Sequence, residues 1–364
     1  MEKDSYTPLF RCCFAALLAL SVIMGCKKPT DRIGDEDGDD DNGITIVEDV
    51  GSDQLVATDA VGRSLPTFDE AGSVRDGKFV GLFYWIWHTD LAEGYPANDL
   101  TKLLKRYPDI MEDYDSPFWP TDDGYYYWGE PLFDYYVNTD KWVLRKHAEM
   151  LADAGVDVII FDCSNGSFTW RQSYLAVCET FLEARKDGVE TPQIAFLMPF
   201  AATEGSMSAI RSLYGLLYQD GKYDELFFKW QGKPLMMGYQ ENLPADVQNY
   251  FTFRPAQGVY NRGPVRSDHW GWLEIYPQHG FGTGATGMYE QVTVGVAQNW
   301  SKERGLTAMN APGVFGRSYT SKGDRAGEEG AVNYGYNFQE QWDRALELDP
   351  DFIFITGWNE WIAG

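Results

Sequence analysis

The sequence is poor in the residues that build metal and disulfide sites. It contains 5 Cys and 4 His in 364 residues. Cys12 and Cys13 fall in an apolar N-terminal run and Cys26 follows it, which leaves Cys163 and Cys178 for the main part of the chain. Two cysteines are no disulfide framework, and their spacing matches no zinc signature. We therefore expect buried free thiols, no metal site and no cofactor.

Basic charge and phosphate-binding motifs are also scarce. The chain has 30 Lys and Arg against 55 Asp and Glu, a net charge of -25, which repels nucleic acid and anionic membrane surfaces. Neither a G-x-G-x-x-G nor a phosphate-binding G-x-x-x-x-G-K follows the first expected strand, and the chain has no G-x-S-x-G elbow. These absences disfavour dinucleotide enzymes, nucleotide hydrolases and esterases. The acidic balance and an aromatic content of 15% of the chain, with 13 Trp, suit neutral, stackable substrates such as sugars.

The N-terminus reads as an export signal. Arg11 precedes the apolar run 12–24, which is too short to span a bilayer. The run closes on Ile-Met-Gly-Cys, which resembles the lipobox of bacterial lipoproteins. This resemblance implies a signal peptide over residues 1–25, lipidation of Cys26 and membrane anchoring in the cell envelope, on the outer membrane and facing the periplasm or the surface. The alternative is a plain secretory signal. Residues 26–76 form an acidic tether and lead-in.

Residues 77–364 alternate between apolar strand patterns and helix patterns. Thr139 is the expected N-cap of the first clear helix, and Gly155 marks its end. Strands are expected at 79–87, 156–162, 193–200, 234–239, 251–256, 272–277, 292–299 and 351–361, and helices at 139–154, 174–186, 206–218 and 337–348. Such alternation predicts a parallel α/β fold, and the strand number favours a (β/α)8 TIM-like barrel.

Two features of the sequence indicate that the expected barrel departs from eight complete strand–helix units. Between residues 251 and 299 two crossovers are too short for ordinary helices, so one of the three strands there could instead be a hairpin arm, leaving seven strands. The last strand of a barrel also needs a covering helix, and none follows Gly364. We therefore expect a catalytic barrel domain that is incomplete at its C-terminus.

In a barrel the active site lies at the carboxyl ends of the strands. Polar residues follow several expected strands, among them Asp162, Glu274 and Glu360, and Trp and Tyr residues accompany them. Glycoside cleavage needs two carboxyl groups, one to protonate the leaving oxygen and one to attack or to activate water, and aromatic faces to stack on sugars. The strand ends therefore predict a carbohydrate site.

The stretch Trp358-Asn359-Glu360-Trp361, read with its barrel context, resembles glycoside hydrolase families 71 and 99, the clan of α-1,3-glucanases and endo-α-mannosidases. The resemblance covers about residues 78–364 and implies a glycosidase acting on an α-linkage. Family 99 resembles this stretch as W-N-E-W-H-E-G. There the first glutamate assists attack by the sugar's own 2-hydroxyl, and the second is the general acid/base. Glu360 matches the first glutamate, but the second falls on Ala363, which cannot transfer a proton.

Another carboxyl group must then act as the acid. Glu274 and Asp162 are the first candidates, ahead of Glu130 and Glu241. The expected substrate-binding residues are Trp358, Asn359, Trp361, Trp85, Trp87, His88, Glu130, Trp128, Glu241, Tyr276, Gln278 and His279. Structural roles compete with these assignments, because Glu360 can brace a strand end, Asp162 can cap a helix, and tryptophans can be core.

The sequence therefore predicts a lipid-anchored, extracytoplasmic glycoside hydrolase that cleaves a polysaccharide or glycan with paired carboxylates. The main alternative is a non-catalytic glycan-binding lipoprotein that keeps the barrel and its aromatics, which Ala363 would explain. A third hypothesis is a barrel enzyme of another chemistry, such as a lyase.

Overall fold

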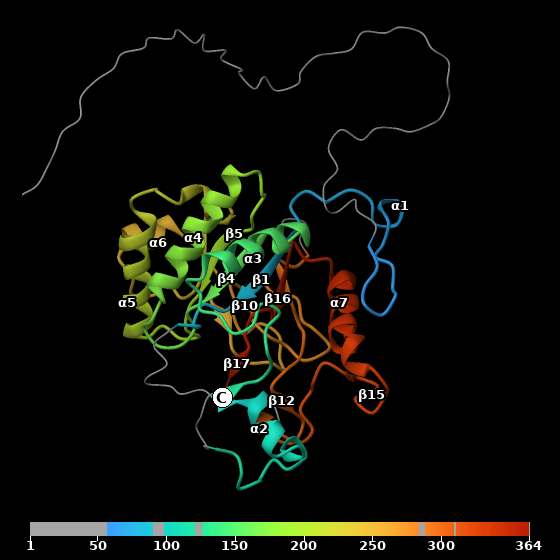
Figure 1. Ribbon diagram of the computed structural model, residues 1–364. Coiled ribbons are helices and arrows are strands. Elements are labelled where there is room, and N and C mark those ends of the chain that lie inside the picture. Colours follow the sequence, from blue (N-terminus) through green and yellow to red (C-terminus); the bar gives the residue numbers. More distant parts are fainter. Residues whose placement is uncertain (1–56, 90–97, 121–125, 284–287, 309–310, 364) are drawn as a thin grey trace, which may run out of the picture. The chain divides into compact units, whose positions relative to one another are not determined.

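The computed structural model describes residues 57–89, 98–120, 126–283, 288–308 and 311–363, which belong to one compact unit, Asp49–Gly364 (Figure 1). The predicted signal peptide, Cys26 and most of the tether lie outside the described residues. Within the described part of the chain, no helix is long and apolar enough to cross a membrane.

A curled parallel sheet forms the centre of the fold, and the predicted α/β class is confirmed. Its hydrogen-bonded order is β11-β16-β1-β4-β5-β7-β8, and β6 adds antiparallel to β7. The strands are β1 Phe79–Tyr84, β4 Val158–Asp162, β5 Gln193–Leu197, β6 Lys229–Trp230, β7 Lys233–Met237, β8 Thr252–Phe253, β11 Gln291–Gly295 and β16 Phe352–Thr356. The last strand thus lies beside the first, as closure towards a barrel requires.

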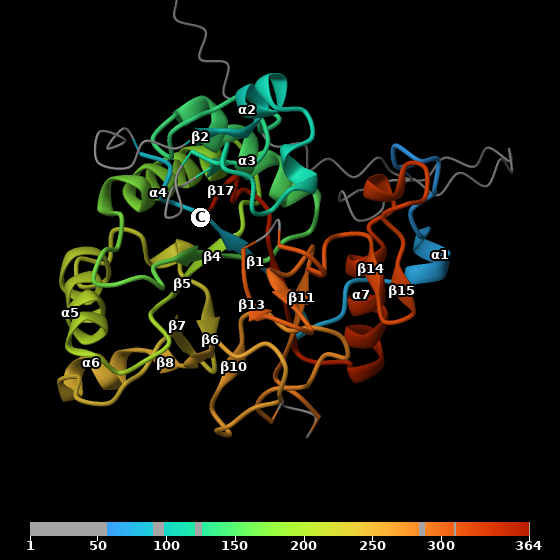
Figure 2. The same ribbon diagram turned by 90° about the horizontal axis from the view of Figure 1, so that it is seen from below.

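Helices connect most neighbouring strands and lie outside the sheet (Figure 2). They are α3 Lys141–Asp153, α4 Arg171–Lys186, α5 Glu204–Leu213 with the π-helical turn η3 Tyr214–Tyr218, α6 Ala245–Tyr250 and α7 Tyr336–Leu348. The predicted N-cap of α3 is wrong by one residue: Asp140, not Thr139, accepts from the backbone N–H groups of Trp142 and Val143. Gly155 ends this helix with a φ of +68°, as predicted.

The wall of the barrel is irregular between β8 and β11. The chain passes from β8 into β9 (Ala256–Gln257), which pairs in parallel with β10 (Trp270–Gly271), so neither is a hairpin arm. The strand expected at 272–277 is wrong, because those residues form a loop. Gln291 bridges β10 and β11: its side chain accepts from the Gly271 N–H at 2.9 Å and donates to the Gly271 carbonyl at 3.0 Å. The side-chain amide of Gln291 thus makes the two hydrogen bonds to Gly271 that a neighbouring strand's backbone would otherwise make.

Strand alternation divides the core into two layers. Side chains of one parity, such as Phe83, Ile160 and Phe354, fill the interior enclosed by the sheet. Those of the other parity, such as Tyr84 and Phe161, pack against the helices. Gly81 shows how tight the interior is, because a Cβ there would lie 2.3 Å from the Phe352 ring. Cys163 and Cys178 are buried free thiols, as predicted.

Short elements complete the described chain. A three-stranded patch, β2-β3-β17, lies beyond the carboxyl end of β16 and joins the aromatic loop, the Tyr- and Trp-rich segment 126–136, to residues 362–363 (Figure 1). The short elements are α1 Phe68–Ala71, β2 Asn98–Asp99, α2 Leu100–Arg106, η2 Ile110–Glu112, β3 Tyr126–Tyr127, η4 Asp224–Leu226, β12 Trp300–Ser301, β13 Gly305–Leu306, β14 Tyr319–Thr320, β15 Gly323–Asp324, η5 Ala331–Asn333 and β17 Ile362–Ala363.

Candidate active site

Asp162 is the last residue of β4 and lies on the inner face of the sheet. Val158 and Ile160 belong to the interior core, and strand alternation gives Asp162 the same direction. The residue is 2% exposed, and its Oδ1 accepts from the backbone N–H of Ser164 at 3.0 Å. Burial raises the pKa of Asp162 to about 6, although the hydrogen bonds from Ser164 oppose this shift.

Glu360 follows β16 and is the carboxyl group of the Trp-Asn-Glu-Trp stretch. Its side chain is exposed to solvent, whereas the surrounding protein strongly disfavours its charged form. Desolvation by the surrounding protein, and then the charge of Asp162, raise the pKa of Glu360 to about 8.

The fold therefore brings Asp162 and Glu360 within electrostatic reach of each other, although 198 positions separate them (360 − 162). Their strands, β4 and β16, are the two neighbours of β1. Adjacent strands lie about 4.8 Å apart, so roughly 10 Å separates the backbones of β4 and β16, with β1 between them.

Asn359 binds the backbone of Trp85, the residue that directly follows β1. The N–H of Trp85 donates to Asn359 Oδ1 at 2.7 Å, and Asn359 Nδ2 donates to the Trp85 carbonyl at 2.9 Å. Asn359 is 6% exposed. It was predicted to bind substrate, but its amide is engaged with the backbone, so the structure places it among the residues that position Glu360.

The two tryptophans of the stretch point in different directions. Trp361 stacks on His88, with ring centroids 3.9 Å apart and planes 7° apart. Trp358 instead packs on His147 of α3, at 4.6 Å, in the outer layer. Gly357, with φ of +102°, separates this segment from the regular strand and permits the change of direction.

His88 is a buried, neutral histidine. Its Nε2 lies 2.9 Å from the Asn359 carbonyl, and burial lowers the pKa of His88 to about 3. A ring that donates to a carbonyl and stacks on Trp361 fixes the last segment of the chain. His147, expected to be structural, is buried with its Nδ1 2.7 Å from the Tyr84 hydroxyl.

Sequence reasoning missed two aromatic residues, Tyr260 and Trp272. Tyr260 is 7% exposed, and burial together with the charge of Glu360 raises the pKa of Tyr260 above its usual range. The partly exposed Trp272 packs its ring 6.2 Å from the Tyr260 ring. Trp272 directly follows β10. If the end of that strand had been predicted correctly, Trp272 would have been counted among the residues at strand ends. The sequence gives no such indication for Tyr260.

Glu274 is bound within its own loop. The carboxyl group is fully buried, its Oε2 accepts from the His279 N–H at 2.8 Å, and its Oε1 lies 2.9 Å from His279 Nδ1. Burial raises the pKa of Glu274 to about 9. Nearby, Gln278 donates to Gln341 of α7 at 2.7 Å, while Tyr276 is 36% exposed. This arrangement supports a loop and leaves Glu274 without access to water.

The remaining predicted residues lie around the strand ends. Glu241 forms an ion pair with Arg266 at 2.7 Å on the surface. Glu130 is exposed. Trp128 donates its backbone N–H to the Trp361 carbonyl at 3.0 Å, which ties the aromatic loop to the end of the chain. Trp87 donates its indole N–H to the Asp162 carbonyl at 2.8 Å and packs on Trp85.

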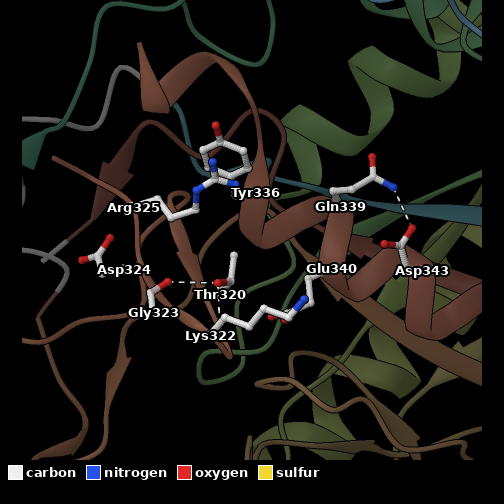
Figure 3. Close-up of a pocket in the computed structure, with 9 residues that line it drawn as sticks. All are labelled: Thr320, Lys322, Gly323, Asp324, Arg325, Tyr336, Gln339, Glu340 and Asp343. Carbon is white, nitrogen blue, oxygen red and sulfur yellow. Dashed lines mark hydrogen bonds between the residues drawn. The ribbon is translucent and has the colours of Figure 1, made fainter. Parts of the chain in front are cut away.

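A separate surface pocket of about 490 Å³ lies between the β14–β15 hairpin and helix α7 (Figure 3). Arg325 covers the ring of Tyr336 there at 3.6 Å, and polar side chains line the rest. None of the predicted site residues lines this pocket. Among the described residues, no group of three or more His, Cys, Asp and Glu could hold a metal ion.

No protein-family model and no curated protein matches the chain. Two solved structures of the GH99 endo-alpha-mannosidase from Bacteroides thetaiotaomicron are similar to it. One is 15% identical with a TM-score of 0.48 and covers 79% of this chain and 86% of that chain. The other, in complex with bis-tris-propane, is 16% identical with a TM-score of 0.46 and covers 78% and 84%. Similarity of this degree establishes no activity, so the function has to be inferred from the chain's own residues.

Proposed function

We propose that this protein is a glycoside hydrolase in which Glu360 and Asp162 are the two working carboxyl groups. The observation that carries the proposal is their placement: Asp162 ends β4, Glu360 follows β16, and these two strands flank β1. Two carboxyl groups with separated pKa values, about 8 and about 6, supply one proton donor and one anion at neutral pH.

The pKa order assigns the roles. Glu360 holds its proton at neutral pH and donates it to the leaving glycosidic oxygen as the C–O bond breaks. Asp162 is ionised above about pH 6 and its negative charge faces the positive charge that develops on the sugar. Water supplies the hydroxyl group of the new reducing end. This assignment differs from the role that the family resemblance implies for Glu360, and it needs no second glutamate at Ala363.

Aromatic residues around the pair support a sugar as the substrate. Tyr260 lies within electrostatic reach of Glu360, Trp272 packs on Tyr260, and Trp87 is anchored to the backbone of Asp162. Aromatic faces suit the C–H faces of sugar rings. The acidic net charge of -25 favours a neutral glycan over a phosphorylated or sulfated one.

Release of reducing ends from a panel of α- and β-linked polysaccharides and glycoprotein glycans tests the proposal. Glu360→Gln and Asp162→Asn should each lower the rate at least a hundredfold, and Glu241→Gln, a surface ion-pair residue, should leave it unchanged. Sugar release that survives both substitutions contradicts the assignment. Retention of the wild-type protein by a glycan-containing gel without any sugar release supports the alternative, a glycan-binding protein, which Ala363 favours.

A further inference from the structure

A stack of four aromatic rings leads away from Asp162 to the protein surface. Ring centroids are 4.3 Å apart for Trp85 and Trp87, 5.2 Å for Trp87 and Trp170, and 6.0 Å for Trp170 and Phe168. The planes differ by 31°, 27° and 32°, so the rings lie roughly face to face. Exposure rises along the stack, from 7% at Trp85 to 69% at Phe168. The outer end therefore presents an open aromatic face.

Packing explains only part of the outer half of this stack, because Trp170 is partly buried against the helix-side core but Phe168 is not. Phe168 leaves most of its surface in water, so it gains little from burial. Trp170 occupies the left-handed region, with φ of 53° and ψ of 51°, which bulky residues rarely adopt. It is also the N-cap of α4 without a capping side-chain hydrogen bond, where Ser, Thr, Asp or Asn is preferred. Local folding preferences thus disfavour Trp at position 170.

The rest of the β4–α4 loop is polar and open. Asn165, Gly166 and Ser167 are exposed, and the loop begins at Ser164, whose N–H is bonded to Asp162. An aromatic face beside hydroxyl and amide groups is the usual combination for binding a sugar ring. The loop connects this surface directly to one of the two carboxyl groups.

We infer that Phe168 and Trp170 form a distal binding subsite, at which a sugar ring stacks one or more units away from the bond that is cleaved. The inference rests on the proposed function and deepens it. It identifies the substrate class as an oligosaccharide or polysaccharide chain that extends along the β4–α4 loop, so that cleavage occurs within the chain. A disaccharide would not reach this subsite.

Two variants test the subsite. Phe168→Ala removes the open face, and Trp170→Asn removes the inner ring while placing a residue that tolerates the left-handed backbone and can cap α4. Asn at position 170 should therefore keep or improve folding. Trp142→Ala is the matched control, because Trp142 is 59% exposed on α3 and packs on Phe133 instead.

The measurement is kcat/KM on a length series of oligosaccharides prepared from a polysaccharide that the wild type cleaves. Phe168→Ala and Trp170→Asn should lower kcat/KM for the long members about tenfold through KM, with the shortest cleaved member unaffected. If both variants keep the length dependence of the wild type while Glu360→Gln is inactive, the subsite is wrong and the proposed function stands.

Where the wild type cleaves nothing, retardation in gels containing α-mannan or a soluble α-1,3-linked glucan gives the readout. Loss of retardation in both loop variants but not in Trp142→Ala supports the subsite even though hydrolysis has failed. Equal retardation of all three variants overturns it, as does the absence of any retardation of the wild type.

Discussion

The side-chain amide of Asn359 pairs with the backbone of Trp85 through hydrogen bonds of 2.7 and 2.9 Å. It continues the ladder between β16 and β1 beyond the point where the strands diverge, and so sets the position of the neighbouring Glu360. Gln291 does the same for Gly271, and Gln341 for Gly295. Buried side-chain amides thus bind backbone N–H and carbonyl groups of the barrel wall at these three positions.

Asn359→Ala should destabilise the protein by about 1–3 kcal/mol, because the buried Trp85 N–H loses its acceptor. The Trp85 carbonyl keeps a second donor, Asn138, at 3.0 Å. Urea unfolding measures the change, with the exposed Asn261→Ala as control. A free energy of unfolding equal to that of the wild type would show that the amide pair contributes nothing.

Catalysis by the proposed pair should have a bell-shaped pH profile. Asp162 must lose its proton, so activity rises through about pH 6, and Glu360 must keep its proton, so activity falls through about pH 8. The profile of kcat/KM against pH measures both limbs. A rate that keeps rising above pH 9 would exclude Glu360 as the acid.

Glu274 should make the folded state less stable at high pH. Its pKa in the folded protein, about 9, lies above the ordinary value of 4.5, so its stabilising contribution is complete below pH 4.5 and is lost as the pH rises through 9. In Glu274→Gln the free energy of unfolding should therefore change less between pH 5 and pH 9 than in the wild type. Identical pH dependence of the two proteins would contradict this account.

The ion pair of Arg254 and Glu290 should be costly to break. Arg254 contacts both carboxylate oxygens, at 2.6 and 2.8 Å, and the two side chains are 14% and 5% exposed. Arg254→Met should destabilise by about 3–5 kcal/mol, since the buried Glu290 loses its counter-charge and keeps only the neutral donors of Gln231 and Trp270. Arg211→Met breaks an exposed pair with Glu204 and should cost at most about 1 kcal/mol. Similar losses of unfolding free energy in both variants would disprove the distinction.

Cys26 should carry the lipid that anchors the protein to the cell envelope. Cys26→Ala should abolish incorporation of a labelled fatty acid and move the protein from the membrane fraction to the soluble fraction. Labelling that persists in the variant would refute the lipobox interpretation and favour a plain secretory signal followed by another modification.

Much of the fold follows from local patterns. The apolar strands that end at Asp162 and Thr356, and the helices α3, α4 and α7, have strong periodicity, so the sequence predicts their type and order. The region after β8 was harder to predict, because β9 and β10 have two residues each and the strand expected at 272–277 is a loop. β10 is joined to β11 through the side chain of Gln291, a contact 20 positions from Gly271 that no local pattern contains.

The sequence by itself determined that Asp162 ends a parallel strand and that Glu360 follows the last one, because an apolar run and the polar residues after it are local properties. Only the tertiary structure decided which carboxyl groups lie near each other. It coupled Asp162 to Glu360 across β1, enclosed Glu274 with His279, and brought Tyr260 beside Glu360. These outcomes depend on strand order and on the burial of each carboxyl group, which arise from contacts between segments far apart in the chain.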